Sequence, residues 1–184
     1  MVSKIFMDPE FQVLEKEFLD NDIDMECVAA QEHVPEVERT IRVIKEQFRA
    51  QYHRLPYQRI PILMIEVLAQ ECGRWLNMFP PKGGASNYYA PMTIVMGRTL
   101  DYKKYCKYTF GSYVQALHEN NPTNTVNPRT IECIYLQTRY AEHTVHKLMN
   151  LNTGKIISRR KITEIPATEE VIARVEELAK GDKM

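Results

Sequence analysis

The sequence predicts an α/β segment followed by a mostly β segment and a C-terminal helix. Three observations lead to this fold class. Residues 1–80 follow the order strand, helix, strand, helix, helix, which is typical of helices that cover a sheet layer. A cluster of prolines and glycines at residues 80–84 interrupts that pattern. Residues 111–165 then hold several short alternating segments separated by turn residues, which predict a small β-barrel.

The N-terminal elements are predicted from alternation and from the placement of one proline. Residues 3–7 predict a short strand that runs into Asp8, and Pro9 suits the first turn of the helix that follows. Residues 23–29 alternate apolar and acidic side chains and predict a second strand. The helix between these strands is expected to bury four apolar side chains: Phe11, Leu14, Phe18 and Leu19.

Two longer helices are predicted next. Apolar residues recur every three or four positions from Val34 to Leu55, so they share one face of a helix over about residues 35–53. That face is expected to dock on a core, and Pro56 ends the helix because the residue before a proline avoids helical geometry. A strongly apolar helix over about residues 61–78 carries the only tryptophan, Trp75.

The second half of the chain is predicted mainly from its turn residues. A short helix over residues 91–96 ends at Gly97. Strands are predicted at residues 111–117, 130–136, 144–151 and 155–165. A last helix begins after Thr168, whose hydroxyl can accept a hydrogen bond from the first turn, and ends near Gly181.

These elements predict four parts of the chain and a shared aromatic core. The parts are residues 1–80, a linker with a short helix at 81–104, a barrel at 105–166 and a C-terminal helix at 167–184. Five aromatic side chains are expected to fill the barrel and pack against the preceding part: Tyr102, Tyr105, Tyr108, Phe110 and Tyr113.

The charge of the chain is unevenly distributed. The 184 residues have a formal net charge of zero, but residues 1–31 contain eight acidic residues and only two lysines. The remainder therefore carries a net positive charge, which favours a polyanionic partner for the body of the protein. Four scattered cysteines, without a Cys-x-x-Cys pair, predict reduced thiols in an intracellular protein of the nucleus or cytoplasm. No apolar run is long enough to cross a bilayer.

The helix over residues 35–53 is the strongest functional signal. Glu38 lies at the edge of its apolar stripe, near the N-terminus of the helix. The flanking face carries cations at spacings that align them over several turns: Arg39, Arg42, Lys45 and Arg49. Such a helix can hold one acid at the edge of its buried face and present a row of cations to solvent.

An ordered set of motifs resembles the integrase segment of copia-type (Pseudoviridae-like) retrotransposon polyproteins. Residues 38–42 read Glu-Arg-Thr-Ile-Arg, like the start of the family's catalytic helix. Residues 75–80 and 90–97 match a Leu-Asn dipeptide near a proline and a Pro-x(5)-Gly element, and Phe110-Gly111 precedes a strand as in the family. Residues 147–159 resemble the family's Leu-x-Asn-x-x-Thr-Gly-Lys-Ile-x-x-Ser-Arg pattern from Leu148 onward, with one residue fewer between Ile156 and Ser158. The similarity covers the C-terminal part of the integrase and nearly the whole of this chain.

The resemblance implies a fold, an activity and site residues. It implies the second half of an RNase H-like integrase core, followed by an SH3-like barrel. In the family, three carboxylates hold two divalent metals, Mg²⁺ or Mn²⁺, for DNA strand transfer. Glu38 resembles the third of these carboxylates and Asp8 the second. The strand with the first acid and the zinc-binding region are not in this sequence, so we expect little independent catalysis.

Simpler interpretations of the same residues stay open. Glu38 could complement the helix dipole, and Asp8 could cap the helix that begins at Pro9. The cations of the helix could form an exposed face paired with neighbouring acids. A second basic run, Arg159, Arg160 and Lys161, is either a DNA contact or a solvated surface. His143 and His146 would point to opposite faces of a strand, which argues against a metal site.

Three functional hypotheses follow. In the first, the chain is a remnant of a retrotransposon integrase that binds DNA without sequence preference and has little or no catalysis of its own. In the second, it is a segment of a longer active integrase, in which Glu38 and Asp8 bind metal. In the third, it is a domesticated, non-enzymatic protein-interaction module. Each of these hypotheses is compatible with a homo-oligomer.

Overall fold

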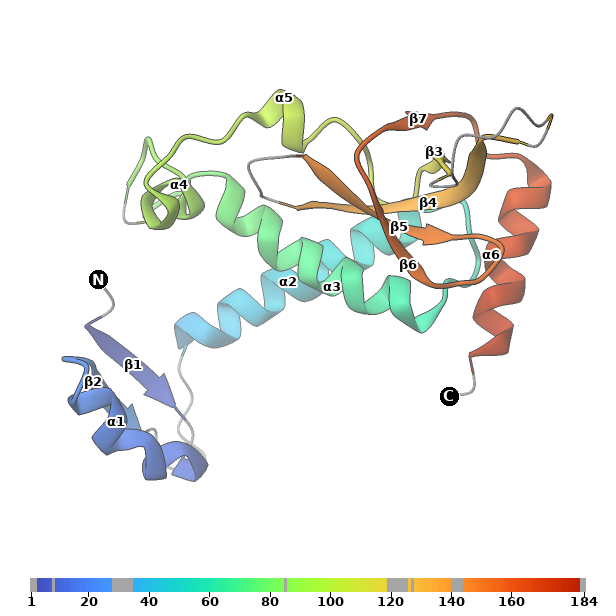
Figure 1. Ribbon diagram of the computed structural model, residues 1–184. Helices are drawn as coiled ribbons and strands as arrows, with labels where there is room; N and C mark the ends of the chain where they lie inside the picture. The colour runs from blue at the N-terminus through green and yellow to red at the C-terminus, as the bar shows by residue number, and fades with distance from the viewer. Residues whose placement is uncertain are drawn as a thin grey trace. The chain divides into compact units, whose positions relative to one another are not determined.

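A computed structural model describes residues 3–7, 9–27, 35–84, 86–118, 126, 128–139 and 144–182 (Figure 1). The protein is a mixed α/β chain, as predicted, and it divides into two compact units, residues Met1–Glu46 and Gln47–Met184. The division falls inside a helix at residue 46 and not near Pro80, because the helix before Pro80 shares its core with the sheet that follows.

The first unit contains two parallel strands connected by short helices. Strand β1 (Lys4–Met7) pairs with β2 (Asp24–Cys27), with Lys4 opposite Asp24. The connection is a 3₁₀-helix, η1 (Pro9–Leu14), followed by a single short α-helix, α1 (Glu15–Leu19). Lys4 also forms an ion pair with Glu26 on the neighbouring strand. The predicted order of strand, helix, strand is therefore confirmed.

The predicted buried face of this connection is only partly correct. Leu14 and Phe18 are half-buried, whereas Phe11 and Leu19 are exposed. Two four-residue strands offer too little apolar surface to cover four large side chains. Within this unit, Met25 is the one apolar residue of the described chain that is fully buried.

Helix α2 (Pro35–Arg54) ends just before Leu55 and Pro56, close to the predicted end. Its apolar stripe is less buried than the sequence predicts. Val37 and Ile41 are exposed, while Ile44, Phe48 and Tyr52 are half-buried. The expectation that the whole stripe docks on a core is wrong for its N-terminal turns, because those turns lie before the part of the helix that belongs to the second unit.

The second unit is built on a five-stranded antiparallel sheet with the order β6-β5-β4-β3-β7. Its strands are β3 (Tyr113–Leu117), β4 (Thr130–Arg139), β5 (Val145–Asn150), β6 (Ile156–Arg159) and β7 (Ile162–Glu164). Its helices are α3 (Ile62–Met78), α4 (Pro91–Met96), α5 (Tyr102–Tyr105) and α6 (Glu169–Gly181). Thr168 caps α6 as predicted, since its hydroxyl accepts from the backbone N–H of Val171.

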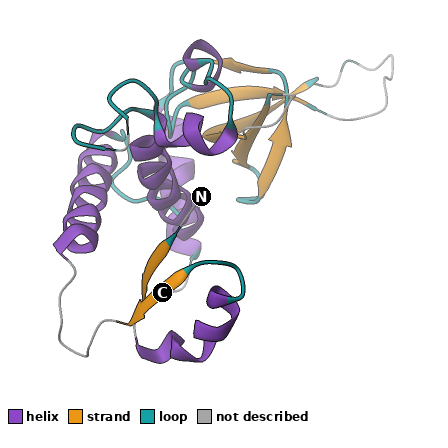
Figure 2. Ribbon diagram, turned by 90° about the vertical axis from the view of Figure 1, so that its left-hand side faces the viewer, coloured by secondary structure: helices purple, strands orange, loops and turns teal. Residues whose placement is uncertain are grey.

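The sequence predicts one strand over residues 155–165 and a small barrel. The single strand is corrected, and the predicted barrel region is an open five-stranded sheet. The segment is divided into β6 and β7, which form opposite edges of an open sheet. Only Arg160 and Lys161 connect these edges, and three Cα steps span at most about 11 Å. The sheet must therefore curl until its edges approach at this corner, and its strands curve around one another in Figure 2. A hydrogen bond of 3.0 Å from Nε of Arg159 to the carbonyl of Leu117 joins β6 to β3 across the curl.

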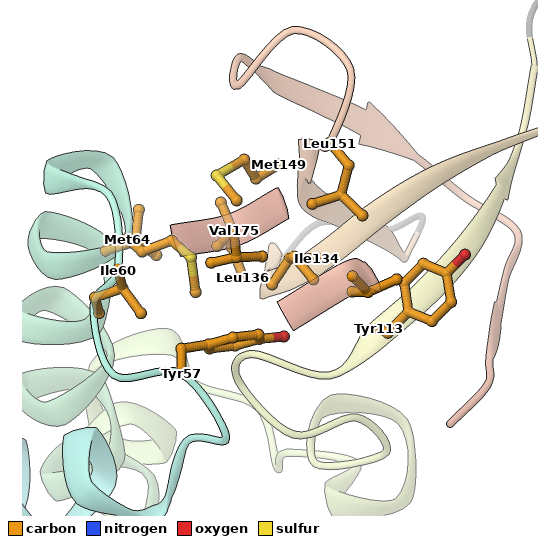
Figure 3. Packing of buried hydrophobic residues seen from close by; sticks show 11 residues of the cluster. Tyr57, Ile60, Met64, Tyr113, Ile134, Leu136, Met149, Leu151 and Val175 are labelled. Atoms are coloured by element: carbon orange, nitrogen blue, oxygen red, sulfur yellow. The ribbon is translucent and has the colours of Figure 1, made fainter. Parts of the chain in front are cut away.

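The curled sheet has an apolar core on each face. On one face, α3 and α6 cover Ile134 and Leu136 of β4, and Figure 3 shows Met64 and Val175 pointing into this core. On the other face, Cys133 and Tyr135 of the same strand pack inside the curl. Four consecutive residues of β4 are thus buried, which an alternating pattern alone would not predict.

The aromatic cluster predicted as core divides into three groups. Tyr105 and Tyr113 are buried, as expected. Tyr108 and Phe110 are half-buried against the two cores of the sheet. Tyr102 is 40% exposed, and its position is described below.

Candidate nucleic-acid interface

Four cationic side chains from two distant parts of the chain line one open groove. Lys104 belongs to α5 and Lys107 follows it, while Arg160 and Lys161 form the connection between β6 and β7. The groove has a volume of about 480 Å³. Its lining residues are Lys104, Lys107, Tyr108, Thr144, His146, Arg160, Lys161 and Ile162. None of these described lining residues is acidic, so the groove favours an anion.

Local capping and packing set the position of the groove. Asp101 caps α5, because its carboxylate accepts from the backbone N–H of Lys104 at 3.3 Å. The chain then brings Tyr108 against the sheet, where the Tyr108 hydroxyl donates to the carbonyl of Ile162 at 3.2 Å. The same tyrosine ring lies under the ammonium of Lys107, with Nζ 5.1 Å from the ring centroid. These contacts fix α5 beside the connection between β6 and β7.

A buried polar chain supports the floor of the groove. His146 on β5 is only 5% exposed, and its Nδ1 lies 2.9 Å from Oγ1 of Thr138, which in turn lies 2.7 Å from the Tyr135 hydroxyl. The backbone carbonyl of Thr138 accepts from Nη1 of Arg74 at 2.6 Å, and Arg74 forms a buried ion pair with Glu71 on α3. The chain of contacts therefore runs from α3, through β4, to the wall of the groove.

The His146 and Tyr135 side chains of this floor are neutral near pH 7. Burial lowers the pKa of His146 below its usual value, and the nearby Lys107 lowers it further. Burial raises the pKa of Tyr135 to about 12. The positive charge of the groove therefore comes from its lysines and from Arg160. Burial also raises the pKa of Glu71, while Arg74 opposes that shift.

His146 is expected to make stability depend on pH in a definite direction. The unfolded chain takes up a proton near the ordinary histidine pKa of about 6.5, whereas folded His146 resists protonation. The free energy of unfolding should therefore fall as pH drops through 6.5 and level off below the lowered pKa. Between pH 7 and pH 5.5, urea denaturation should show a smaller fall in the free energy of unfolding for His146→Gln than for the wild type.

Several other titratable groups are common to both proteins in that comparison. His53, His118 and Glu71 are unchanged by the substitution, so their contributions cancel in the difference between wild type and variant. An identical pH dependence in the two proteins would mean that His146 is not held neutral by its surroundings.

The predicted basic run on the late strand has two different roles in the structure. Arg159 is half-buried, and its guanidinium donates to the carbonyls of Leu117 and Ser158. It therefore joins the edge strand β6 to β3 across the curl of the sheet. Arg160 and Lys161 are exposed and line the groove, so these two residues keep the DNA-contact interpretation most directly.

The cations of α2 lie on an exposed helix surface. Arg39, Arg42 and Lys45 belong to the first unit, and Arg49 belongs to the second. All four side chains are exposed, as the sequence predicts. None of them lines the groove between α5 and the sheet.

The predicted metal ligands do not form a described site. Glu38 is exposed in α2, and Asp8 lies outside the described residues. Over the ranges that the structure describes, no group of three or more His, Cys, Asp or Glu side chains is arranged to hold a metal ion. The Mg²⁺ or Mn²⁺ pair that the resemblance implies therefore stays a prediction.

Sequence reasoning missed half of the groove. Lys104 and Lys107 lie more than 50 positions before Arg160 and Lys161, and no local pattern connects the two pairs. The available signal was Asp101 followed by a lysine- and tyrosine-rich segment, which indicates a capped basic turn. The sequence pattern of His143 and His146 indicates only that a metal site is absent and gives no sign that His146 lines a groove; His143 lies outside the described residues.

Comparisons with known proteins do not assign a family. Neither a scan against protein-family models nor a search of curated proteins finds a match to this sequence. Among the described residues, no helix is both long enough and apolar enough to cross a membrane.

Proposed function

We propose that this chain is part of a retrotransposon integrase and binds DNA without sequence preference. The observation that carries the DNA-binding part is the groove with Lys104, Lys107, Arg160 and Lys161 and no acidic lining residue. Cations spaced along a groove contact phosphates, which are common to all sequences.

The order of motifs and the coarse fold support the integrase part of the proposal. The parallel pair β1 and β2, followed by α2 with Glu38 in its first turns, is the arrangement expected at the end of an RNase H-like core. The curled five-stranded sheet, with its short link between β6 and β7, is the arrangement expected of an SH3-like barrel that has not closed. In this proposal the barrel provides DNA affinity, and Glu38 is inherited from the catalytic site.

The test is a salt titration with matched charge-reversal variants. Binding of a fluorescent duplex to the full chain should weaken steeply with salt, because each phosphate contact releases condensed counterions. Lys107→Glu with Lys161→Glu should reduce the slope of log K against log [salt] by about two and lower affinity at least about tenfold. The control is Lys155→Glu with Lys180→Glu, two exposed lysines of the same unit outside the groove.

The outcomes separate the proposal from a general charge effect. Equal losses in the two double variants would mean that net charge, and not the groove, determines binding. Undetectable duplex binding at low salt would reject DNA binding by this chain altogether. A further arm replaces Arg39, Arg42, Lys45 and Arg49 with Glu, and a loss there would add α2 to the DNA-binding surface.

A further inference from the structure

A second surface feature, separate from the groove, is a stack of three aromatic rings. Trp75 and Phe79 of the α3 C-terminus have ring centroids 5.8 Å apart and planes 19° apart. Phe79 also stacks on Tyr102 of α5, with centroids 5.4 Å apart and planes 12° apart. Phe79 is therefore the middle ring of a nearly parallel stack, which we call the aromatic ladder.

The aromatic ladder is exposed although its rings are large and apolar. Trp75, Phe79 and Tyr102 retain 36%, 45% and 40% of their accessible surface. Scattered single apolar residues are normal on protein surfaces, but three stacked rings form a contiguous patch that marks a binding surface.

Local structure holds the ladder rigid before any partner binds. Trp75 and Phe79 are four residues apart, so they lie on one side of the helix end. The Tyr102 hydroxyl donates to the carbonyl of Met78 at 2.9 Å. Met78, Leu100 and Tyr105 form a small core that joins the end of α3 to α5. Rings fixed in this way lose little conformational entropy when they bind.

Helix α5 places the ladder beside the basic groove. Tyr102 of the ladder and Lys104 of the groove are two residues apart, which is about 3 Å along a helix axis and roughly half a turn around it. The two surfaces therefore flank a single helical turn, which also carries Lys103. A chain with charged groups on one side and flat rings on the other could cross α5 and contact both surfaces.

We propose that the aromatic ladder binds unpaired bases of single-stranded nucleic acid whose phosphates lie in the groove. This rests on the proposed function, because the groove supplies the phosphate contacts. Stacking on aromatic side chains is tolerant of sequence, since every base has a π-face, and it is closed to the bases of an intact duplex. The ladder thus adds a preference for single strands to a groove that binds any phosphate backbone.

Trp75 provides a direct signal for this binding because it is the only tryptophan. A short oligothymidylate added to the full chain should quench Trp75 fluorescence, whereas inorganic polyphosphate should occupy the groove without quenching. Bases can stack only on the outer faces of Trp75 and Tyr102, because Phe79 is covered on both sides. Phe79→Ala removes the ring that holds these two parallel, so it should weaken oligothymidylate binding about tenfold and leave duplex binding unchanged. The control is Tyr88→Ala, which removes an exposed aromatic ring outside the ladder. Thermal melting of each variant shows whether it remains folded.

Each outcome supports or rejects a specific part of the proposal. Loss of single-strand binding in Phe79→Ala, with duplex binding kept, supports the ladder. Equal quenching by polyphosphate, or equal loss of single-strand and duplex binding in a folded Phe79→Ala, rejects base stacking. If Phe79→Ala changes nothing while Lys107→Glu with Lys161→Glu loses duplex binding, the ladder is rejected and the proposed function stands. If no nucleic acid binds at low salt, both are rejected.

Discussion

Arg74→Met is expected to destabilise the second unit by about 3–5 kcal/mol, because it leaves the buried Glu71 carboxylate without its cation. The Glu71 and Arg74 side chains retain only 5% and 9% of their accessible surface, so water cannot replace the lost partner. The substitution also removes the donor to the Thr138 carbonyl, at the start of the polar chain that leads to His146. Trp75 is adjacent to the substituted residue, and its fluorescence in a urea titration measures the loss.

A double variant distinguishes the cost of an unpaired charge from lost packing. Glu71→Leu with Arg74→Met replaces both charges by apolar side chains of similar size and should recover most of the stability. The matched control is Glu177→Gln, which removes the exposed partner of Arg174 and should cost less than about 1 kcal/mol. If the double variant is no more stable than Arg74→Met, the ion pair is not the source of the loss.

Gly111→Ala should cost about 2–4 kcal/mol, which is the second large effect. Gly111 has a φ of +84°, a conformation in which a side chain costs about 1–2 kcal/mol. An added Cβ would also lie 2.4 Å from Cδ2 of Leu55, and displacing a leucine that packs on the core costs roughly 1–3 kcal/mol. The backbone cannot easily move away, because the Gly111 N–H donates to Tyr135 and its carbonyl accepts from the Tyr57 hydroxyl.

Gly97→Ala is the matched control for this second prediction. Gly97 has a similar φ of +65°, but no atom lies within 4 Å of the added Cβ, so only the backbone strain remains. Its cost should be about 1 kcal/mol, because alanine also restricts the unfolded chain. In a Leu55→Ala background, Gly111→Ala should lower the free energy of unfolding less than it does in the wild type, and so come closer to the cost of Gly97→Ala. If Gly111→Ala and Gly97→Ala lower the free energy of unfolding equally in chemical denaturation, Leu55 moves away from the added Cβ without an energetic cost.

Local patterns predicted most elements of this fold and failed where distant segments meet. The strands at Tyr113–Leu117, Thr130–Arg139 and Val145–Asn150 follow from alternation, and the ends of α2 and α6 follow from Pro56 and Thr168. The division into β6 and β7 was missed, because residues 155–165 have continuous β propensity. What separates them is pairing with β5 on one side and with β3 on the other, and neither pairing is encoded within the segment itself.

The candidate site shows the same limit. Arg160 and Lys161 were predicted as a basic run, but their neighbours Lys104 and Lys107 become neighbours only through the fold. Arg159 belongs to the same run in sequence, and the curl of the sheet turns it toward Leu117. Tyr102 was predicted as core because it is aromatic, yet its register on α5 places it in the aromatic ladder. The sequence therefore predicted the basic run, whereas the neighbours of Arg160 and Lys161 and the exposure of Tyr102 depend on how distant segments pack.

The two-residue link between β6 and β7 has a consequence for the order of folding. Strands β3 to β6 can pair in succession along the chain, whereas β7 must find β3, with Ala116 opposite Ile162. This last pairing closes the longest loop of the sheet, which is entropically costly and favours a late folding step. Until it forms, β3 keeps an unpaired edge and Lys161 has no fixed position. During synthesis, a chain that has left the ribosome only as far as residue 159 would therefore expose the aggregation-prone strand β3 and lack the anion groove.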